Sequence, residues 1–185
     1  MRRRLATGLL GIVLLSLLSC PSQGENGEYV LKAVFLERFT RFVDWPEAAA
    51  MHDKAEPFVI GHIGTSPLLQ TLQDVYAEQR ILGKEVRVRS IQRLEEIEGC
   101  HTLFVASTER ERLPRILDAA SGHPIITVGD SDGFAEAGVL FNFFVEQDRI
   151  RFEINHGALR AAGLSVSHLL LGVARVIHPT TEVQP

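Results

Sequence analysis

Cysteine is scarce in this chain of 185 residues, which contains only Cys20 and Cys100. Cys20 lies in an N-terminal segment that we expect to be cleaved off or acylated, so Cys100 would remain as the single free thiol. An intrachain disulfide is therefore excluded, even in an exported protein that reaches an oxidising compartment. The apolar residues 103–105 follow Cys100 closely, and we expect a buried, unreactive thiol.

Motifs of several enzyme and metal-binding classes are also missing. The chain has no phosphate-loop lysine pattern, no three-glycine dinucleotide fingerprint, no Cys-x-x-Cys and no His-x-x-x-His. Its seven histidines lack the spacing of metal ligands or of a base beside a nucleophile. The sequence therefore predicts neither a metal nor a cofactor, and it predicts that the protein is not an enzyme.

An enzymatic alternative rests on one glycine-rich loop. Asp130, Asp132 and Glu136 share this loop, and His101 and Glu153 could approach it at the strand ends, where open α/β sheets carry their sites. Acidic residues are also common in such loops because they cap and form turns. We favour this second interpretation.

The chain has no excess of basic residues. Its formal net charge is −4, and it becomes −7 without residues 1–24, which hold three arginines and no acidic residue. Nucleic acid is therefore excluded as a partner class. The hydrophobic content of 45% and the absence of repeats predict one domain over residues 25–178, followed by a flexible tail, residues 179–185.

The longest apolar run is short for a membrane span. Residues 5–18 are a run of 14 after the basic Met1–Arg4, fewer than the roughly 20 residues that cross a bilayer. We interpret residues 1–24 as a secretory signal peptide, which predicts a periplasmic protein. Leu17–Cys20 resembles a bacterial lipobox. Acylation of Cys20, ordinary cleavage near residues 22–24 and an uncleaved anchor stay open.

The stretch Pro124–Asn155 holds the strongest apolar segments. Residues 124–128 predict a buried strand, and the loop 129–138 ends it. Two further strand-like runs, residues 139–146 and 149–155, are separated by two residues only, which predicts a β-hairpin.

The second arm of this hairpin alternates in polarity, which predicts one buried and one solvent-exposed face. The buried face would carry Ile150, Phe152 and Ile154, and the exposed face Arg149, Arg151, Glu153 and Asn155.

The remaining elements alternate between strands and helices. The expected strands are residues 58–63, 85–91 (an exposed or edge strand) and 101–106. The expected helices are residues 29–45, 67–79, 93–98, 109–120 and 158–162, followed by a last apolar helix from Ser165 or Ser167 to about Ile177. Pro46 would end the first helix, Ser66 would cap the second with Pro67 at its first position, and Ser107 would cap the helix 109–120. Leu169 and Val173 of the last helix would face inward. This order predicts a three-layer α/β fold, in which a mostly parallel sheet with an antiparallel C-terminal hairpin at its edge is flanked by helices.

Several short motifs, in the same order, resemble the YfiR/HmsC family over about residues 28–178. They are Phe-Val-Asp-Trp-Pro at 42–46, the strand-turn 61–64, Cys100-His101 before an apolar strand, Thr-Val-Gly-Asp at 127–130 with Gly133-Phe134, and residues 149–155 followed by Ala-Gly-Leu at 162–164.

The resemblance implies a periplasmic α/β protein that represses an inner-membrane diguanylate cyclase by binding its periplasmic region. The output would be lower cyclic di-GMP and less biofilm, an outer-membrane lipoprotein could relieve the restraint, and no catalysis is required. The resemblance also implies a cysteine partner for Cys100 in or beside the first sheet strand, but this chain has Ile60, Gly61 and His62 there. Redox control through that bridge is therefore not expected.

Two kinds of binding site follow. A partner-binding surface on the first helix would use Phe35, Phe39, Phe42 and Trp45, because this helix is more hydrophobic than one buried stripe requires. The alternative is that these aromatic residues pack on the sheet. A homodimer paired along residues 85–91 or across the helices is a further expectation.

The second kind is a ligand pocket at the carboxyl ends of the strands. It would be lined by Gly64, Thr65, Ser66, Asp130 and Phe134, and it belongs to the alternative function of a periplasmic small-molecule-binding sensor module that acts on another envelope partner. The Gly-Thr-Ser turn could hold an anion at a helix N-terminus, but we favour a simple tight turn between strand and helix.

Overall fold

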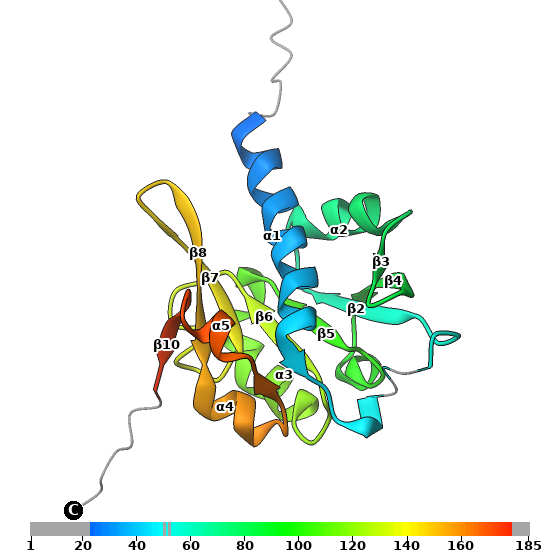
Figure 1. Cartoon of the computed structure of the whole chain (residues 1–185). Helices are drawn as coiled ribbons and strands as arrows, with labels where there is room; N and C mark the ends of the chain where they lie inside the picture. The colour runs from blue at the N-terminus through cyan, green and yellow to red at the C-terminus, as the bar shows by residue number, and fades with distance from the viewer. Residues whose placement is uncertain (1–22, 50, 52, 179–185) are drawn as a thin grey trace, which may run out of the picture.

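A curled sheet of eight strands organises the chain (Figure 1). The computed structural model describes residues 23–49, 51 and 53–178. The predicted lipobox at Cys20, most of the predicted signal peptide and the tail 179–185 lie outside these residues. The strands follow the order β10-β8-β7-β6-β5-β2-β4-β3. They are β2 (Phe58–Ile63), β3 (Arg80–Ile81), β4 (Lys84–Ile91), β5 (Thr102–Val105), β6 (Ile126–Gly129), β7 (Phe141–Glu146), β8 (Arg149–Asn155) and β10 (Arg175–Ile177).

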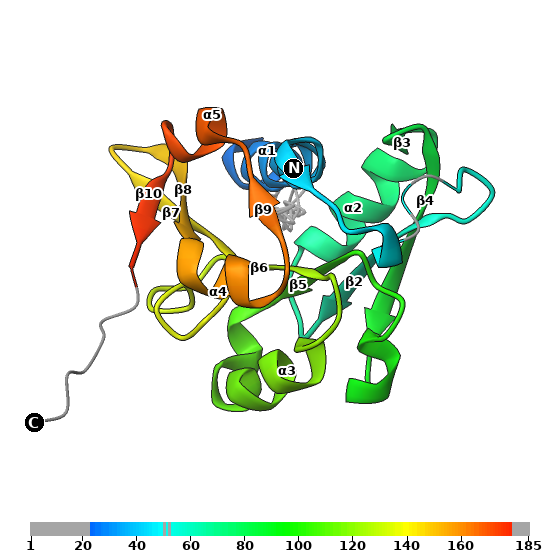
Figure 2. The ribbon, with the colours of Figure 1, turned by 60° about the horizontal axis from the view of Figure 1, so that its bottom comes forward.

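The centre of the sheet is parallel, as predicted. β4, β2, β5, β6 and β7 pair in parallel, whereas β7 with β8 and β3 with β4 are antiparallel. Every residue of β2, β5 and β6 is buried, which explains their short runs of apolar, mostly β-branched residues. Helices cover both faces (Figure 2), so the predicted α/β fold is confirmed.

The helix α1 (Gln23–Phe42) packs on one face of the sheet together with α2 (Leu68–Tyr76). Its inward side chains Ala33, Leu36 and Phe39 are at most 1% exposed. The hydroxyl of Tyr76 donates to the carbonyl of Ala33 at 2.8 Å and joins the two helices. α1 ends three residues before the predicted Trp45, because β1 (Val43–Asp44) pairs with β9 (Ser165–Val166) in a separate antiparallel sheet. A 3-10 turn, η1 (Glu47–Ala49), follows.

The opposite face is covered by α3 (Leu113–Ala120) and two 3-10 turns, η2 (Leu94–Ile97) and η3 (Ser107–Arg112). The predicted single helix 109–120 is therefore split into η3 and α3. Ser107 is not the N-cap, because it is the first residue of η3 and Ala106 precedes it at the N-cap position. Ser66 does contribute at the start of α2, since its hydroxyl accepts from the amide of Leu68 at 3.3 Å.

The predicted hairpin is confirmed. Gln147 and Asp148 both have positive φ, 50° and 56°, as a two-residue type I′ turn requires. The predicted polarity of β8 is wrong at two positions, because Glu153 and Asn155 are buried. β8 is not an edge strand: β10 pairs with it in parallel.

The two buried polar side chains of β8 have hydrogen-bond partners. Glu153 accepts from the Asn142 amide at 2.9 Å. Asn155 donates to the carbonyl of Ala135 and accepts from the amide of Ala158, both at 2.8 Å, and so caps α4 (His156–Ala161). Burial is tolerated here because these groups are satisfied.

The predicted last helix is wrong. Residues 165–177 form β9, a four-residue helix α5 (His168–Leu171) and β10. Leu169 and Val173, expected to face inward, are 63% and 67% exposed. The β-branched residues at the end of this segment meet a free strand edge on β8, and ladder pairing there outweighs helix propensity. Arg175 stabilises the arrangement by stacking over Phe144 at 3.8 Å.

The part of the chain described here contains no helix that is long and apolar enough to cross a membrane.

Cys100 is buried, as predicted, with 5% exposure. Burial raises the pKa of its thiol, although Arg89 at 3.3 Å favours the thiolate. A β-carbon placed on Gly61 would lie 2.8 Å from the Cys100 sulfur. Gly61 of β2 is therefore the position that a disulfide partner of Cys100 would occupy.

The substitution Gly61→Cys is expected to create an intrachain disulfide with Cys100. In a disulfide, the β-carbon of one cysteine lies roughly 3 Å from the sulfur of the other, close to the distance found here. Thiol titration and mass spectrometry of the oxidatively refolded mature chain should show no free thiol and the loss of two hydrogens. Ser90→Cys, on the exposed side of β4, is the control that should keep both thiols. Two free thiols in the Gly61→Cys variant would contradict the prediction.

Candidate functional site

A groove lies at the carboxyl edge of the sheet, between the first turns of α1 and the tip of the β7–β8 hairpin, both of which project in the same direction (Figure 1). We call it the carboxyl-edge groove. It consists of two adjoining hollows of about 500 and 300 Å³ that share Glu28, Val145 and Ile150. The larger is also lined by Gly27, Leu31, Phe35, Asp148 and Arg149, and the smaller by Lys32, Asp130, Asp132, Phe143 and Phe144.

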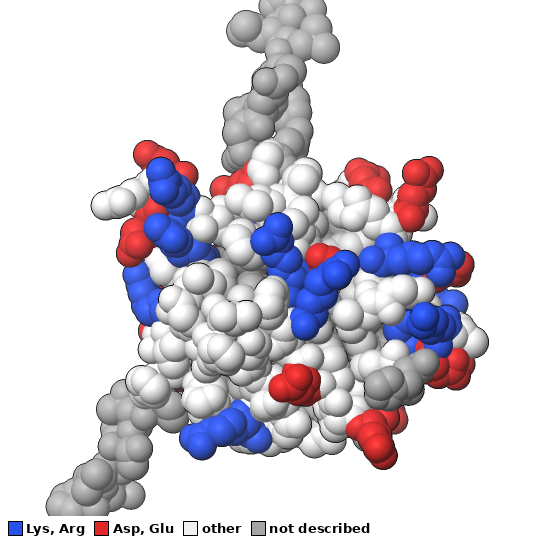
Figure 3. All heavy atoms as spheres, viewed as in Figure 1, with Lys and Arg blue, Asp and Glu red and all other residues white. Residues whose placement is uncertain are grey.

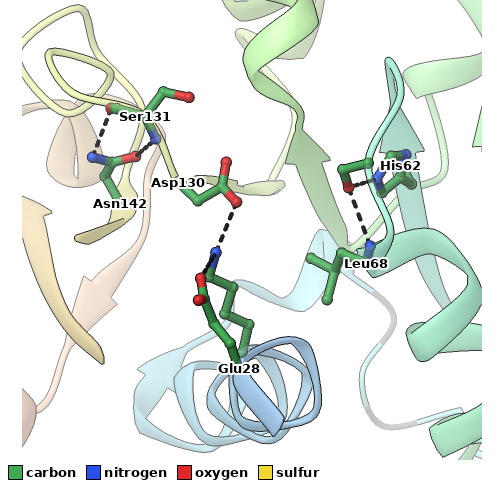
Figure 4. Close-up of polar contacts among 8 residues, drawn as sticks. Glu28, His62, Leu68, Asp130, Ser131 and Asn142 are labelled. Atoms are coloured by element: carbon green, nitrogen blue, oxygen red, sulfur yellow. Dashed lines mark hydrogen bonds and ion pairs between the residues drawn. The ribbon is translucent and has the colours of Figure 1, made fainter. Parts of the chain in front are cut away.

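A buried lysine fixes α1 at the floor of the groove. Lys32, 5% exposed, pairs with Asp130 at 2.9 Å and with Glu28 at 2.8 Å (Figure 4). Burial by itself would lower the pKa of Lys32, but the two carboxylates more than offset this and raise it. Lys32 is therefore an ammonium at neutral pH. Because Asp130 follows β6 directly, this ion pair joins the helix to the centre of the sheet.

Asp130 is held in place by the residues that follow it. The side chain of Asn142 accepts from the amide of Ser131 at 3.2 Å and donates to its carbonyl at 3.0 Å (Figure 4). The same side chain donates to Glu153. These bonds tie the start of the 129–138 loop to β7 and β8. The carboxylate that receives Lys32 is thus positioned by two neighbouring strands.

The walls of the groove expose apolar side chains. Leu31 is 43% and Val145 61% exposed, and Val30 and Val34, on the same outer side of α1, are 45% and 37% exposed. In the view of Figure 3 the surface over α5 and the upper part of α1 is mainly uncharged. Clustered exposed apolar side chains of this kind mark interaction surfaces.

The four predicted partner-binding aromatic residues lie mostly inside. Phe39 is fully buried against Phe141, with ring centroids 4.4 Å apart. Phe35 and Phe42 are half-buried against the same core. Trp45, also half-buried, donates to the carbonyl of Thr40 at 3.0 Å. Phe39 thus packs on the sheet, as the alternative interpretation has it. Phe35 lines the groove. A partner contact by any of the four residues stays a prediction.

The five predicted ligand-pocket residues have different surroundings. Asp130 lines the smaller hollow. Gly64 (φ 90°) packs against Thr108, whose hydroxyl accepts from the amide of Thr65 at 3.0 Å. Phe134 is fully buried, with the Arg110 guanidinium 5.0 Å above its ring. The structure thus gives Gly64, Thr65 and Phe134 packing roles, and ligand binding by this set stays a prediction.

Ser66 has a partner that was not anticipated. Its hydroxyl lies 2.8 Å from Nε2 of His62 (Figure 4), a fully buried histidine on β2 that stacks on Phe104. Nδ1 of His62 has no hydrogen-bond partner among residues 23–49, 51 and 53–178. Burial lowers the pKa of His62 to about 4, so the imidazole is neutral at neutral pH.

Acid is expected to destabilise the protein through His62. Its folded-state pKa of about 4 lies below the unfolded value of about 6.5, so the unfolded chain binds the proton first as the pH falls. The free energy of unfolding therefore decreases as the pH falls from ~6.5 to ~4, by roughly 2–4 kcal/mol in total. Urea unfolding at several pH values should show this loss, and His62→Gln should remove it while the other acid-sensitive groups remain. An unchanged pH profile in that variant would contradict the assignment.

Sequence reasoning missed Lys32, Leu31 and Val145 as groove residues. For Lys32 a signal was available: it precedes Leu36 and Phe39 by four and seven residues, the spacing of a single helix face. A lysine on the buried face of an apolar helix requires a carboxylate partner. For Val145 there was no signal, because its neighbour α1 is more than 100 residues away in the sequence.

Comparison with known proteins identifies a matching family. A family model described as YfiR/HmsC-like matches residues 29–175. Comparison with curated proteins found no match.

Solved structures agree with the fold. The ABC domain in complex with L-Trp from Streptococcus pneumonia is 13% identical with a TM-score of 0.50, and the match covers 71% of this chain and 61% of that one. A substrate binding protein with adhesive properties from Clostridium difficile, in its ligand-free, open structure, is 12% identical with a TM-score of 0.52, over 69% of this chain and 56% of that one. The chain thus spans about three-fifths of these relatives, and at such identities the likeness concerns the fold alone.

Proposed function

The chain belongs to the YfiR/HmsC-like family, and from this premise we propose that it is a periplasmic regulatory binding protein without catalytic activity. Its target is the periplasmic region of an inner-membrane diguanylate cyclase. Binding represses the cyclase and lowers cyclic di-GMP and biofilm formation. An outer-membrane lipoprotein that competes for the regulator relieves the repression.

The observation that carries this proposal is the carboxyl-edge groove with its exposed apolar walls. Leu31 and Val145 are 43% and 61% exposed on opposite sides of it. Burying such side chains against a partner contributes roughly 25 cal/mol per Å² of apolar surface. A concave, partly apolar surface suits the insertion of one or two anchor side chains from another protein.

The groove is also suited to regulation. One wall is α1 and the other is the hairpin. At the floor, the ion pair of Lys32 with Asp130 joins α1 to the end of β6, and Asn142 of β7 holds the neighbouring Ser131. The affinity for a partner held between the two walls therefore depends on the position of one wall relative to the other. Any event that shifts α1 against the sheet changes the affinity for the partner, which is the coupling that a repressor with an antagonist needs.

Crosslinking of the tagged protein in intact cells tests the proposal. The expected capture is an inner-membrane protein with a cytoplasmic diguanylate cyclase domain. Leu31→Glu and Val145→Glu should each reduce capture by at least about tenfold, the effect of losing ~1.4 kcal/mol of binding free energy, and raise cellular cyclic di-GMP.

Gln73→Glu, which adds the same charge to an exposed position of α2, is the matched control and should leave capture unchanged. Thermal melts of all variants separate loss of binding from unfolding. Failure to capture any cyclase, or equal capture by both groove variants and the control, would contradict the proposal.

A second candidate function is favoured by the size of the groove. Its hollows of about 500 and 300 Å³ fall in the range of small-molecule sites. In this alternative the protein is a small-molecule-binding sensor module that acts on another envelope partner. Native mass spectrometry of protein purified from the periplasm should then show a retained ligand that Leu31→Glu releases.

A further inference from the structure

The strand β4 presents an open edge at the side of the sheet opposite the hairpin. On its inner side, residues 86–91 pair one-to-one with residues 58–63 of β2, without a bulge. On its outer side, β3 pairs only with Lys84 and Glu85. No strand in the described part of the chain pairs with the outer side of residues 86–91. Their outward backbone amides and carbonyls thus form a regular ladder that a further strand can continue.

The two faces of this edge differ in chemistry. Val86 and Val88 are half-buried and pack against the core on the side of α2. Arg87 and Arg89 point to the other face, since side chains alternate along a strand. A segment added to β4 would therefore place every second side chain beside valines and the intervening ones beside arginines.

Both arginines lack a carboxylate partner. No acidic side chain in the described part of the chain forms an ion pair with Arg87 or Arg89. Arg89 donates to neutral acceptors, the carbonyls of Glu96 and Glu98 at 3.2 Å and the sulfur of Cys100 at 3.3 Å, and its buried Nε has no acceptor among the described residues. One face of the edge therefore carries two arginines without an ion pair among the described residues, next to Glu85, which pairs with Arg80.

We propose that the outer edge of β4, residues 86–91, is a docking site for an extended acidic segment of another protein. The segment adds a strand to the sheet. Its backbone pairs with β4, its acidic side chains lie beside Arg87 and Arg89, and its intervening apolar side chains lie beside Val86 and Val88. The site is independent of the carboxyl-edge groove and of the function proposed for it.

Pairing with a second copy of this chain, the expected homodimer along this edge, is opposed by the charges that symmetry brings together. Two identical antiparallel strands related by a two-fold axis perpendicular to the sheet pair residue i with residue 2c − i, where c is the central residue. Centring the pair on residue 87, 88 or 89 places Arg87 opposite Arg87, Arg87 opposite Arg89, or Arg89 opposite Arg89. Like charges directly opposite one another are destabilising. The arginines thus oppose self-pairing and favour an acidic strand.

Titration with short peptides tests the proposal on the folded chain. The probe is a capped heptapeptide in which glutamate alternates with valine and threonine, and the comparison peptide carries lysine in place of glutamate. The acidic peptide should bind at least about tenfold more tightly than the basic one, with amide chemical-shift changes confined to β4 and its neighbours. Raised salt should weaken this binding.

Charge reversal at the edge is the decisive variant. Arg87→Glu should abolish binding of the acidic peptide and create binding of the basic one. Arg115→Glu, at an exposed position of α3, is the matched control and should change neither. The exposed Arg87 forms no ion pair with another residue that the structure describes, so its replacement breaks none of these contacts and a thermal melt should show the variant folded. Absence of saturable binding by the acidic peptide, equal binding to the Arg87→Glu variant, or shift changes away from β4 would each overturn the proposal.

Discussion

Replacement of Phe39 by alanine is expected to lower the free energy of unfolding by about 3–5 kcal/mol, the cost of deleting a fully buried phenylalanine. Its ring is 0% exposed and lies 4.4 Å from the ring of Phe141, 5.0 Å from Phe152 and 5.6 Å from Phe143. Together with Phe35, it packs α1 on β7 and β8. Chemical denaturation measures this loss, and a thermal melt should show a melting temperature lower by roughly 2–4 °C per kcal/mol.

Val34→Ala, on the exposed side of the same helix, is the matched control. Val34 is 37% exposed, and a surface substitution of this kind changes stability by no more than about 0.5 kcal/mol. Equal stability of the Phe39→Ala variant and the control would show that α1 does not pack on the sheet as described. Such a result would also favour the prediction that Phe39 is an exposed partner contact.

Lys32→Met is expected to cost about as much, roughly 3–5 kcal/mol, because it leaves Asp130 without its cation in a largely buried place. The Asp130 side chain is 15% exposed, and that of Lys32 is 7% exposed. Urea unfolding of the variant and the wild type at pH 7 measures this loss.

The double variant Lys32→Met with Asp130→Leu should recover most of this stability, since it removes the largely buried unpaired carboxylate and leaves only Glu28, which is 36% exposed, without its partner. Arg41→Met serves as the control for an exposed ion pair. Arg41, whose side chain is 59% exposed, pairs with Glu37 on the same helix, and its loss should cost less than about 1 kcal/mol. A double variant no more stable than Lys32→Met would refute the ion pair as the cause.

These two substitutions act on the same contact between α1 and the sheet, and they connect stability with the proposed function. α1 supplies one wall of the carboxyl-edge groove, so a variant that loosens it also disturbs the position of Leu31 relative to Val145. We expect Lys32→Met to weaken partner capture even at temperatures where the protein stays folded. The double variant, which restores the packing, should restore part of the capture.

The sequence by itself determined the local elements and the class of the fold. β2 was predicted at the residues where it occurs, 58–63, because a buried parallel strand needs a continuous apolar run and the Gly-Thr-Ser turn ends it. The hairpin was predicted because two residues between strand-like runs allow only a tight turn. The burial of Cys100 followed from its apolar neighbours. These are properties of residues close together in the chain.

Only the tertiary structure decided where each side chain lies relative to distant segments. Residues 165–177 have a helical pattern, but the open edge of β8 made the last three of them a strand. Glu153 and Asn155 alternate as exposed residues would, yet Asn142 and Ala135 supply hydrogen bonds that permit their burial.

The groove depends most strongly on the tertiary structure. Lys32 and Asp130 are 98 residues apart, and Leu31 meets the hairpin only because α1 crosses the sheet. Local periodicity specifies which face of an element is apolar, but pairing across the fold depends on which faces meet when the chain closes on its core. For that reason most of the elements could be predicted from the sequence, whereas the groove could not.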